Sequence, residues 1–222
     1  MTTPAVAALA PLARRIRYIF GGLAVFVVIV AVAPPLSSDA RRYVLAGAIQ
    51  FSLIALAMPA LVALWAPTSR ITSRWDAERL ARLVARREAI RNSRDGLVRL
   101  VLRLLPYLAA LILWRIPVSV DALATSPVLV AAEIATFAVV GVVFWMELVP
   151  SPPVPPIVSS GQRIVPAAVA MWMIWILAYF VGFSHAAWFP SVHPNRRGLG
   201  VVADQELSSG ALWIAAAATF LP

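Results

Sequence analysis

Few side chains in this sequence are of types suited to chemistry. The chain has no Cys, which excludes disulfides, thiolate nucleophiles and thiolate metal ligands. Its two His residues, His185 and His193, share one polar stretch with Asp204 and Glu206. Imidazole and carboxylate groups bind zinc or copper, so this stretch is a candidate metal site. It lacks the close His spacing of a tight site, and an ordinary polar loop is the first interpretation.

A second group of polar residues lies inside long apolar runs. Gln50, Arg115 and Glu133 each fall roughly 5–10 Å from the same end of their runs, at 1.5 Å per helical residue. Polar groups are costly inside a membrane, so this intramembrane polar layer needs an explanation. The first interpretation is an ion pair between Arg115 and Glu133, with Gln50 hydrogen-bonded nearby. The alternative is a site for transporting a proton, an ion or a small solute.

No sequence motif indicates catalysis. The chain has no phosphate-binding loop, nucleophile elbow or paired catalytic carboxylates. We therefore predict that the protein is not an enzyme.

The elements that position these residues are membrane helices. Hydrophobic residues make up 61% of the 222 residues and charged residues only 13%, which excludes an ordinary water-soluble domain. Because about 20 apolar residues cross a bilayer as a helix, the runs predict one all-α transmembrane domain. Its six expected spans cover residues 18–33, 43–65, 97–118, 127–149, 164–183 and 207–221. The last is short, and five spans with a re-entrant C-terminal segment are the alternative.

The charges predict the orientation of these spans. All 19 basic residues are Arg, and the formal net charge is +9. With the N-terminus inside, fourteen Arg fall on the inner side and five on the outer side. This asymmetry places both termini in the cytoplasm of a bacterial cell, in a multi-pass inner-membrane protein. It gives no support to nucleic-acid binding. The first span is expected to be a retained signal anchor rather than a cleaved signal peptide.

The longest inner segment predicts an amphipathic helix over residues 73–95. Ser73 and Asp76 have the spacing of a capping box at its start. We expect its Arg residues to contact anionic lipid headgroups or a partner protein, with a solvated helix as the alternative. These residues are Arg74, Arg79, Arg82, Arg86, Arg87 and Arg91. The Pro-rich segment 150–156 should form a stiff connector.

Four groups of short motifs follow one another along the chain. The first is Gly47-Ala48-Ile49-Gln50-Phe51 with Pro59 and Ala66-Pro67, and the second is Trp114-Arg115-Ile116-Pro117 with Asp121-Ala122-Leu123. The third is Glu133-Ile134 with Gly141 and Phe144-Trp145, and the fourth is Asp204-Gln205 with Gly210 and Trp213. Their order and content resemble the CtaG-like family of cytochrome c oxidase assembly factors over nearly the whole chain.

This resemblance implies a function and also a difference from the family. Members of the family are linked to copper delivery and oxidase maturation, and they typically carry His at several of these positions. Here those positions hold Gly47, Phe51, Arg115, Val130 and Ile134. We therefore expect a metal-free assembly factor or accessory subunit of a membrane electron-transfer complex, with a respiratory oxidase as the first candidate partner. The alternatives are a copper chaperone that uses His185 and His193, and a small-solute or ion transporter.

Overall fold

The regular elements of the chain are helices. The computed structural model describes residues 4–93, 95–150, 152–189, 192 and 200–221, and none of these residues forms a β-strand. The all-α class is therefore confirmed. In chain order the helices are α1 (Pro4–Val32), α2 (Leu36–Asp39), α3 (Val44–Ser52), the π-helical turn η1 (Leu53–Ala57), α4 (Met58–Trp65), α5 (Thr68–Thr72), α6 (Ala77–Arg91), α7 (Asp95–Leu113), α8 (Pro117–Thr125), α9 (Pro127–Thr136), the π-helical turn η2 (Phe137–Gly141), α10 (Val142–Leu148), α11 (Ser160–Gly182) and α12 (Val201–Phe220).

Within the described residues, five helical segments are long and apolar enough to cross a membrane. They are Arg15–Val32 in α1, Val44–Trp65 across α3, η1 and α4, Asp95–Leu113 in α7, Pro127–Leu148 across α9, η2 and α10, and Ser160–Gly182 in α11. Each overlaps one of the first five expected spans. The expected sixth span corresponds to α12, whose 20 residues exceed the expected 15. It is not among the five, because Asp204, Gln205 and Glu206 lower the mean hydropathy of its first turns.

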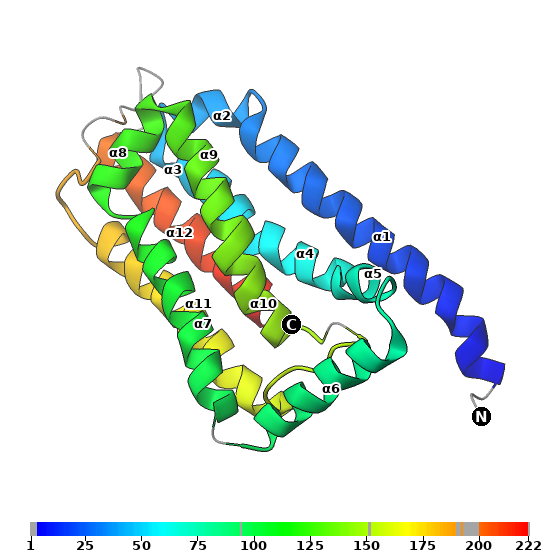
Figure 1. The fold of residues 1–222 in the computed structure, drawn as a ribbon. Coiled ribbons are helices and arrows are strands. Elements are labelled where there is room, and N and C mark those ends of the chain that lie inside the picture. Colours follow the sequence, from blue (N-terminus) through cyan, green and yellow to red (C-terminus); the bar gives the residue numbers. More distant parts are fainter. Residues whose placement is uncertain (1–3, 94, 151, 190–191, 193–199, 222) are drawn as a thin grey trace.

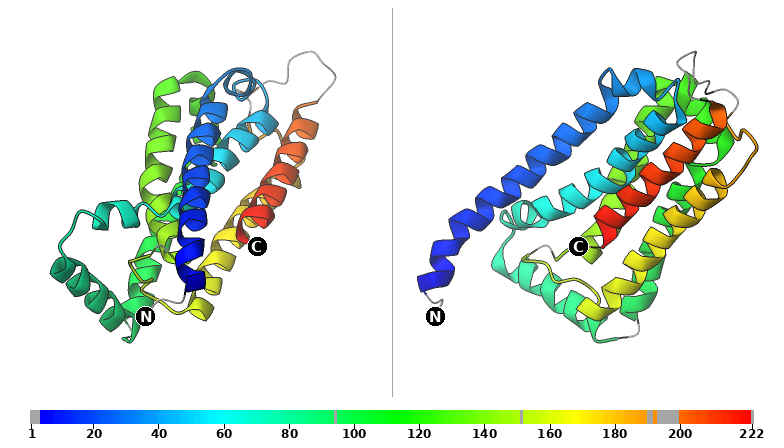
Figure 2. Two further views of the ribbon diagram at one scale, coloured as in Figure 1. Left: turned by 90° about the vertical axis from the view of Figure 1, so that its right-hand side faces the viewer. Right: turned by 180° about the vertical axis from the view of Figure 1, so that it is seen from behind.

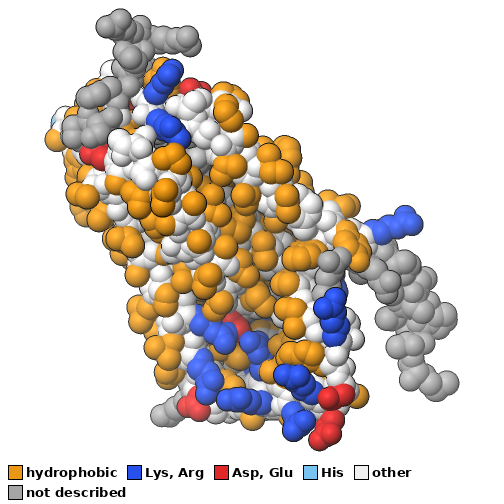
Figure 3. Space-filling view, turned by 45° about the horizontal axis from the view of Figure 1, so that its top comes forward, with side chains coloured by type: hydrophobic (Ala, Val, Ile, Leu, Met, Phe, Trp, Pro, Cys, Tyr) orange, Lys and Arg blue, Asp and Glu red, His pale blue; other side chains and the backbone are white. Residues whose placement is uncertain are grey.

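The helices form an elongated bundle with two distinct ends. Figure 1 shows α2 and α8 at one end, with α6, the start of α1 and the end of α12 toward the other. The helix α12 packs between α11 and α3, whereas α1 lies against α4 and extends beyond the bundle (Figure 2). Much of the lateral surface is hydrophobic, and Arg side chains gather at the end that contains α6 (Figure 3). This arrangement is the one expected of a membrane bundle with a basic inner face.

Two central helices carry π-helical turns that face each other. Pro59 follows η1 and has no N–H to donate to the carbonyl of Ala55, four residues earlier. The Tyr107 hydroxyl of α7 donates a 3.0 Å hydrogen bond to that carbonyl. Opposite, Gly141 at the end of η2 lies so close to Pro59 that an added Cβ would be 3.1 Å from the proline ring. Gly141 therefore permits the close packing of these two irregular helices.

Aromatic rings fill the space around these turns. The Tyr107 ring stacks on Phe144 with 4.6 Å between centroids, and it meets Phe137 edge-on at 6.1 Å. All three rings are fully buried. Phe51 of α3 contacts Phe137 edge-on at 5.7 Å, which links the core to the polar end of the bundle. Such contacts add directional preference to the burial of large apolar surfaces.

The amphipathic helix is shorter than predicted. It begins at Ala77 and ends at Arg91, inside the expected range of 73–95. Asp76, rather than Ser73, is its N-cap residue, because the Asp76 carboxylate accepts a hydrogen bond from the backbone N–H of Arg79. The helix therefore starts at the acidic residue of the predicted capping box rather than at its Ser.

Candidate functional site

A cavity of about 200 Å³ opens at the end of the bundle that holds α2 and α8. Its walls come from α2, α3, α8 and α9, together with the end of α1 and the turn after α7. Apolar side chains such as Val32, Leu123 and Ile134 form part of the wall. Gln50, Arg115 and Glu133, the three residues of the predicted intramembrane polar layer, all line it. The fold thus brings together polar residues from three separate parts of the chain.

Arg115 enters the cavity from a turn rather than from a helix. The expected span 97–118 ends early, since α7 stops at Leu113 and Pro117 starts α8. Proline favours the first position of a helix, where no N–H is needed, and so explains the break. The Arg115 side chain is nevertheless buried, and its guanidinium carbon lies 5.2 Å from the centroid of the Phe51 ring. Its Nη2 has no hydrogen-bond partner.

Glu133 faces the same cavity from α9. It is only 2% exposed, and its Oε1 has no hydrogen-bond partner. Arg115 and Glu133 do not form the direct ion pair that the sequence predicts, since no contact within ion-pair distance joins these two described residues. Gln50 does not bridge them either, because its amide nitrogen donates a 2.7 Å hydrogen bond to the Ala31 carbonyl of α1. Two opposite charges therefore line one cavity without bonding to each other.

The cavity also collects the positions at which the resemblance leads us to expect His. All five line it, although they come from α3, α9 and the turn after α7: Gly47, Phe51, Arg115, Val130 and Ile134. None of these side chains is a metal ligand, and Arg115 adds a positive charge. The oxygen donors that remain in the lining are those of Ser37, Gln50 and Glu133. Copper in proteins favours imidazole and sulfur ligands, so this donor set does not fit the copper that the resemblance implies.

The outer-loop metal candidate is not assembled by the part of the chain that the structure describes. His185 is exposed, and His193 lies outside the described residues. Among the described residues, no group of three or more His, Asp or Glu side chains could hold a metal ion. Asp204 has another role. Its Oδ2 accepts a 2.6 Å hydrogen bond from the N–H of Val44, and its Oδ1 accepts one of 3.1 Å from Leu45. The Asp204 carboxylate of α12 therefore caps the N-terminus of α3.

Gln205, the next residue of the family-like motif, fixes the loop after α11. Its side-chain nitrogen donates a 2.7 Å hydrogen bond to the Val181 carbonyl near the end of α11. Its side-chain oxygen accepts a 3.0 Å bond from the N–H of Trp188. Since Gln205 is fully buried, these bonds satisfy a polar group inside the bundle. The Asp-Gln pair thus joins α12 to α3 and to α11.

The remaining family-like residues are used mainly for packing. Trp213 stacks on Trp175 of α11 at 5.5 Å, and Trp145 stacks on Phe220 of α12 at 4.9 Å. Trp114 is half-buried beside Arg115, while Gly210 is exposed with open space beside it. None of these four motif residues lines the cavity.

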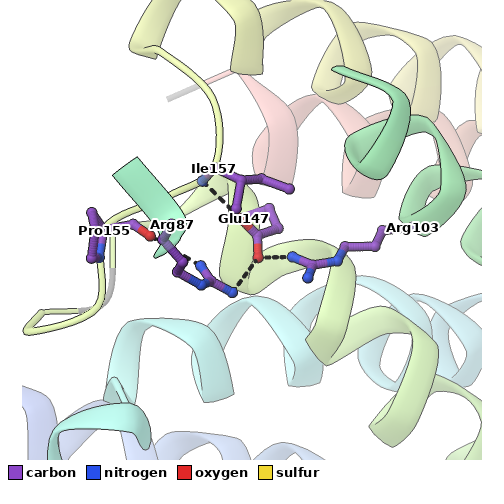
Figure 4. A network of polar contacts seen from close by, with 5 residues as sticks. All are labelled: Arg87, Arg103, Glu147, Pro155 and Ile157. Carbon is purple, nitrogen blue, oxygen red and sulfur yellow. Dashed lines mark hydrogen bonds and ion pairs between the residues drawn. The ribbon is translucent and has the colours of Figure 1, made fainter. Parts of the chain in front are cut away.

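A second polar centre lies at the opposite end of the bundle, around Glu147 of α10 (Figure 4). Glu147 is 1% exposed and forms ion pairs with Arg103 of α7 and, at 3.0 Å, with Arg87 of α6. Its Oε2 accepts a 3.2 Å hydrogen bond from the backbone N–H of Ile157. Arg87 also donates a 3.0 Å bond to the Pro155 carbonyl. We name these five residues the Glu147 network.

The Glu147 network was not predicted from the sequence. Glu147 stands near the end of an apolar run, just before the Pro-rich connector. That end is expected on the same side as the Arg-rich segment 70–103, so an acid there has Arg partners available. Burial also lowers the pKa of the Arg87 guanidinium from its usual value. Arg87 therefore differs from the other Arg residues expected to contact lipid or a partner, which are exposed: Arg74, Arg79, Arg82, Arg86 and Arg91.

Comparison with known proteins gives one family. A family model described as the cytochrome c oxidase caa3 assembly factor (Caa3_CtaG) matches residues 5–222. No curated protein and no solved structure gives a significant match to the chain. Because the family match covers nearly the whole sequence, the protein belongs to the cytochrome c oxidase caa3 assembly factor family.

Proposed function

We propose that the protein acts in cytochrome c oxidase assembly as a non-catalytic factor or accessory subunit without a metal of its own. One observation carries this proposal. The five positions at which the resemblance leads us to expect His line one cavity, and their side chains there cannot ligate copper. Two polar residues of the family-like motif, Asp204 and Gln205, form hydrogen bonds that connect helices. The contacts that hold the helices together are therefore present, whereas the expected metal ligands are replaced by other residues.

The proposal includes a topology of six spans with both termini in the cytoplasm. The excess of Arg around α6 supports this orientation, since inner segments of membrane proteins are rich in basic residues. The polar start of α12 is compatible with a sixth span, because Asp204 and Gln205 are buried against other helices rather than facing outward. The placement of α6, the start of α1 and the end of α12 toward one end of the bundle supports an even number of crossings (Figure 1).

On the inner side, α6 would present its exposed Arg residues to the membrane or to an oxidase subunit. The Glu147 network supports this role by attaching α6 to α7, α10 and the Pro-rich connector. A helix fixed in this way offers its Arg side chains in a defined orientation. Anionic lipid headgroups and acidic loops of membrane subunits are the chemistries that they would recognise.

The experiment that tests the proposed function uses a strain of the source organism that lacks this protein. We expect the deletion strain to contain little mature caa3-type oxidase, measured by its haem spectrum and by immunoblots of its subunits. Wild-type protein should restore the oxidase, and so should the His185→Ala and His193→Ala double variant. Oxidase subunits should also co-purify with the tagged protein in mild detergent.

Three outcomes would contradict the proposal. A normal amount of mature oxidase in the deletion strain would show that the protein is not needed for oxidase assembly. Restoration of the oxidase by added copper alone, together with failure of the double His variant, would favour the copper chaperone. Solute flux in proteoliposomes that is abolished by Glu133→Gln would favour the transporter.

A further inference from the structure

The cavity at the α2–α8 end presents two opposite charges that are not joined by a direct hydrogen bond or ion pair. Arg115 is 6% exposed and Glu133 is 2% exposed, and both line the cavity. The Nη2 of Arg115 and the Oε1 of Glu133 are buried without a hydrogen-bond partner. The nearby amide nitrogen of Gln50 is already bonded to the Ala31 carbonyl. Leaving a buried charged group unpaired is costly, so a molecule that supplies the missing donor and acceptor would be bound favourably.

The signs of the two charges select the chemistry of that molecule. An anion alone would bond to Arg115 but would be repelled by the carboxylate of Glu133. A cation alone would bond to Glu133 but would be repelled by Arg115. A zwitterion satisfies both, because its anionic oxygens accept from the guanidinium while its ammonium donates to the carboxylate. Arg41, which is exposed and also lines the cavity, adds a second positive group.

The volume and position of the cavity suit a small ligand or a headgroup. At about 200 Å³ it is somewhat larger than a cavity of roughly 150 Å³ that accommodates benzene. It lies at the end of the apolar bundle, where lipid headgroups would meet the protein if these helices cross a membrane. We propose that this cavity binds a zwitterion whose phosphate and ammonium are joined by a short carbon link. The source is either the headgroup of phosphatidylethanolamine or a free phosphoethanolamine-like solute. The proposal does not rest on the role in oxidase assembly.

The test measures binding to the full-length protein purified in mild detergent. The shift of the thermal unfolding midpoint, followed by the fluorescence of the eight Trp residues, reports ligand binding to the folded state. The probes are dihexanoyl phosphatidylethanolamine, dihexanoyl phosphatidylglycerol and free phosphoethanolamine. We expect phosphatidylethanolamine to raise the midpoint at concentrations at least about tenfold lower than phosphatidylglycerol, which has no ammonium. Glu133→Gln should abolish this preference.

A cavity-filling variant keeps the test valid if changes to the charged residues impair folding. Gly47 lines the cavity, and a Cβ added there would meet only the Ala40 carbonyl, at an ordinary 3.6 Å. Gly47→Leu therefore fills the cavity, improves helix propensity and leaves Arg115 and Glu133 in place. Gly22→Leu in α1 is the matched control, because Gly22 is exposed with nothing near its Cβ position.

Each outcome supports or overturns the proposal. It is supported if the response to phosphatidylethanolamine is lost in Gly47→Leu and kept in Gly22→Leu. A response to the lipid alone then identifies a headgroup, whereas a response to phosphoethanolamine as well identifies a free solute. Equal responses to the two lipids would contradict the proposal that the ligand is a zwitterion. No response, or one that survives Gly47→Leu, would mean that the cavity contains only water or that the lipid binds elsewhere.

Discussion

At the scale of single residues, Glu147 shows how one buried carboxylate can connect distant parts of a membrane protein. It accepts from Arg87 of α6, from Arg103 of α7 and from the backbone N–H of Ile157, just after the Pro-rich connector. The two Arg side chains are 21% and 29% exposed, whereas the Glu147 side chain alone is 2% exposed. Loss of the carboxylate would therefore leave two cations near an apolar environment without their shared partner.

We expect Glu147→Gln to destabilise the protein by about 2 kcal/mol, because breaking a buried charge pair costs more than an exposed one. The measurement is unfolding in mixed detergent micelles, followed by Trp fluorescence. Glu88→Gln on the exposed face of α6 is the control and should change stability little. Adding Arg103→Met should recover part of the loss. Fully additive effects of the two substitutions would contradict the Glu147 network.

Tyr107 gives a second prediction at this scale. Tyr107→Phe keeps the stacked ring but leaves the Ala55 carbonyl without the donor that Pro59 cannot supply. We expect a loss of about 1–3 kcal/mol, the cost of a buried group left unsatisfied. In the same unfolding assay, Tyr179→Phe, at an exposed position of α11, should have a much smaller effect. Equal effects would show that the hydrogen bond to the π-helical turn adds nothing.

At the scale of elements, helix α12 owes its position to polar contacts as well as to packing. Asp204 caps α3, and Gln205 holds the loop after α11. On the α11 side the two helices approach closely at Gly182, where an added Cβ would lie 2.8 Å from both the Cβ and Oγ of Ser209. A side chain at residue 182 would therefore push α12 away from α11.

Gly182→Ala is expected to destabilise the protein by about 1–3 kcal/mol through overpacking. Ser209→Gly in the same chain should relieve part of this strain, since it removes both atoms that the new Cβ would meet. Gly210→Ala is the control, because a Cβ there has nothing within 4 Å. Thermal midpoints in detergent measure all three variants. A neutral Gly182→Ala would contradict the close approach of α11 and α12.

The helices also show which features of the fold and the site could be predicted from the sequence alone. Hydropathy located the five apolar helices, because a helix that crosses a bilayer needs a long apolar run whatever its neighbours are. It could not locate the end of α7 at Leu113 or the longer α12, which depend on a proline and on buried polar contacts. Depth along the helices placed Arg115 and Glu133 at one level. Their failure to pair depends on side-chain packing, which periodicity does not encode. The Glu147 network joins residues up to 68 positions apart, and the sequence contains only an indirect sign of it.

At the scale of the whole molecule, the bundle has a basic end with α6 and an opposite end with the cavity. The proposed topology places α6 in the cytoplasm and the cavity at the outer side. Since the chain has no natural Cys, single cysteines can report this orientation without interference.

We expect a membrane-impermeant maleimide to label Thr125→Cys, at the exposed end of α8, in intact spheroplasts. Ala85→Cys, on the exposed face of α6, should be labelled only after the membrane is disrupted. The physical reason is the preference of Arg-rich segments for the inner side. The reverse labelling pattern would show that the protein has the opposite orientation in the membrane. Labelling of both residues before disruption would place α6 and the cavity on the same side of the membrane.

The central claim is that a member of an oxidase assembly family works without its own copper. The most direct measurement is the copper content per chain of wild-type protein, grown with ample copper and purified in mild detergent free of oxidase subunits. The Gln50→Ala and Glu133→Ala double variant is measured in parallel, since these residues supply oxygen donors at the cavity. Our account predicts far less than one copper per chain in wild-type protein free of oxidase subunits, with no difference in the variant. One copper per chain that is lost in this variant would contradict it.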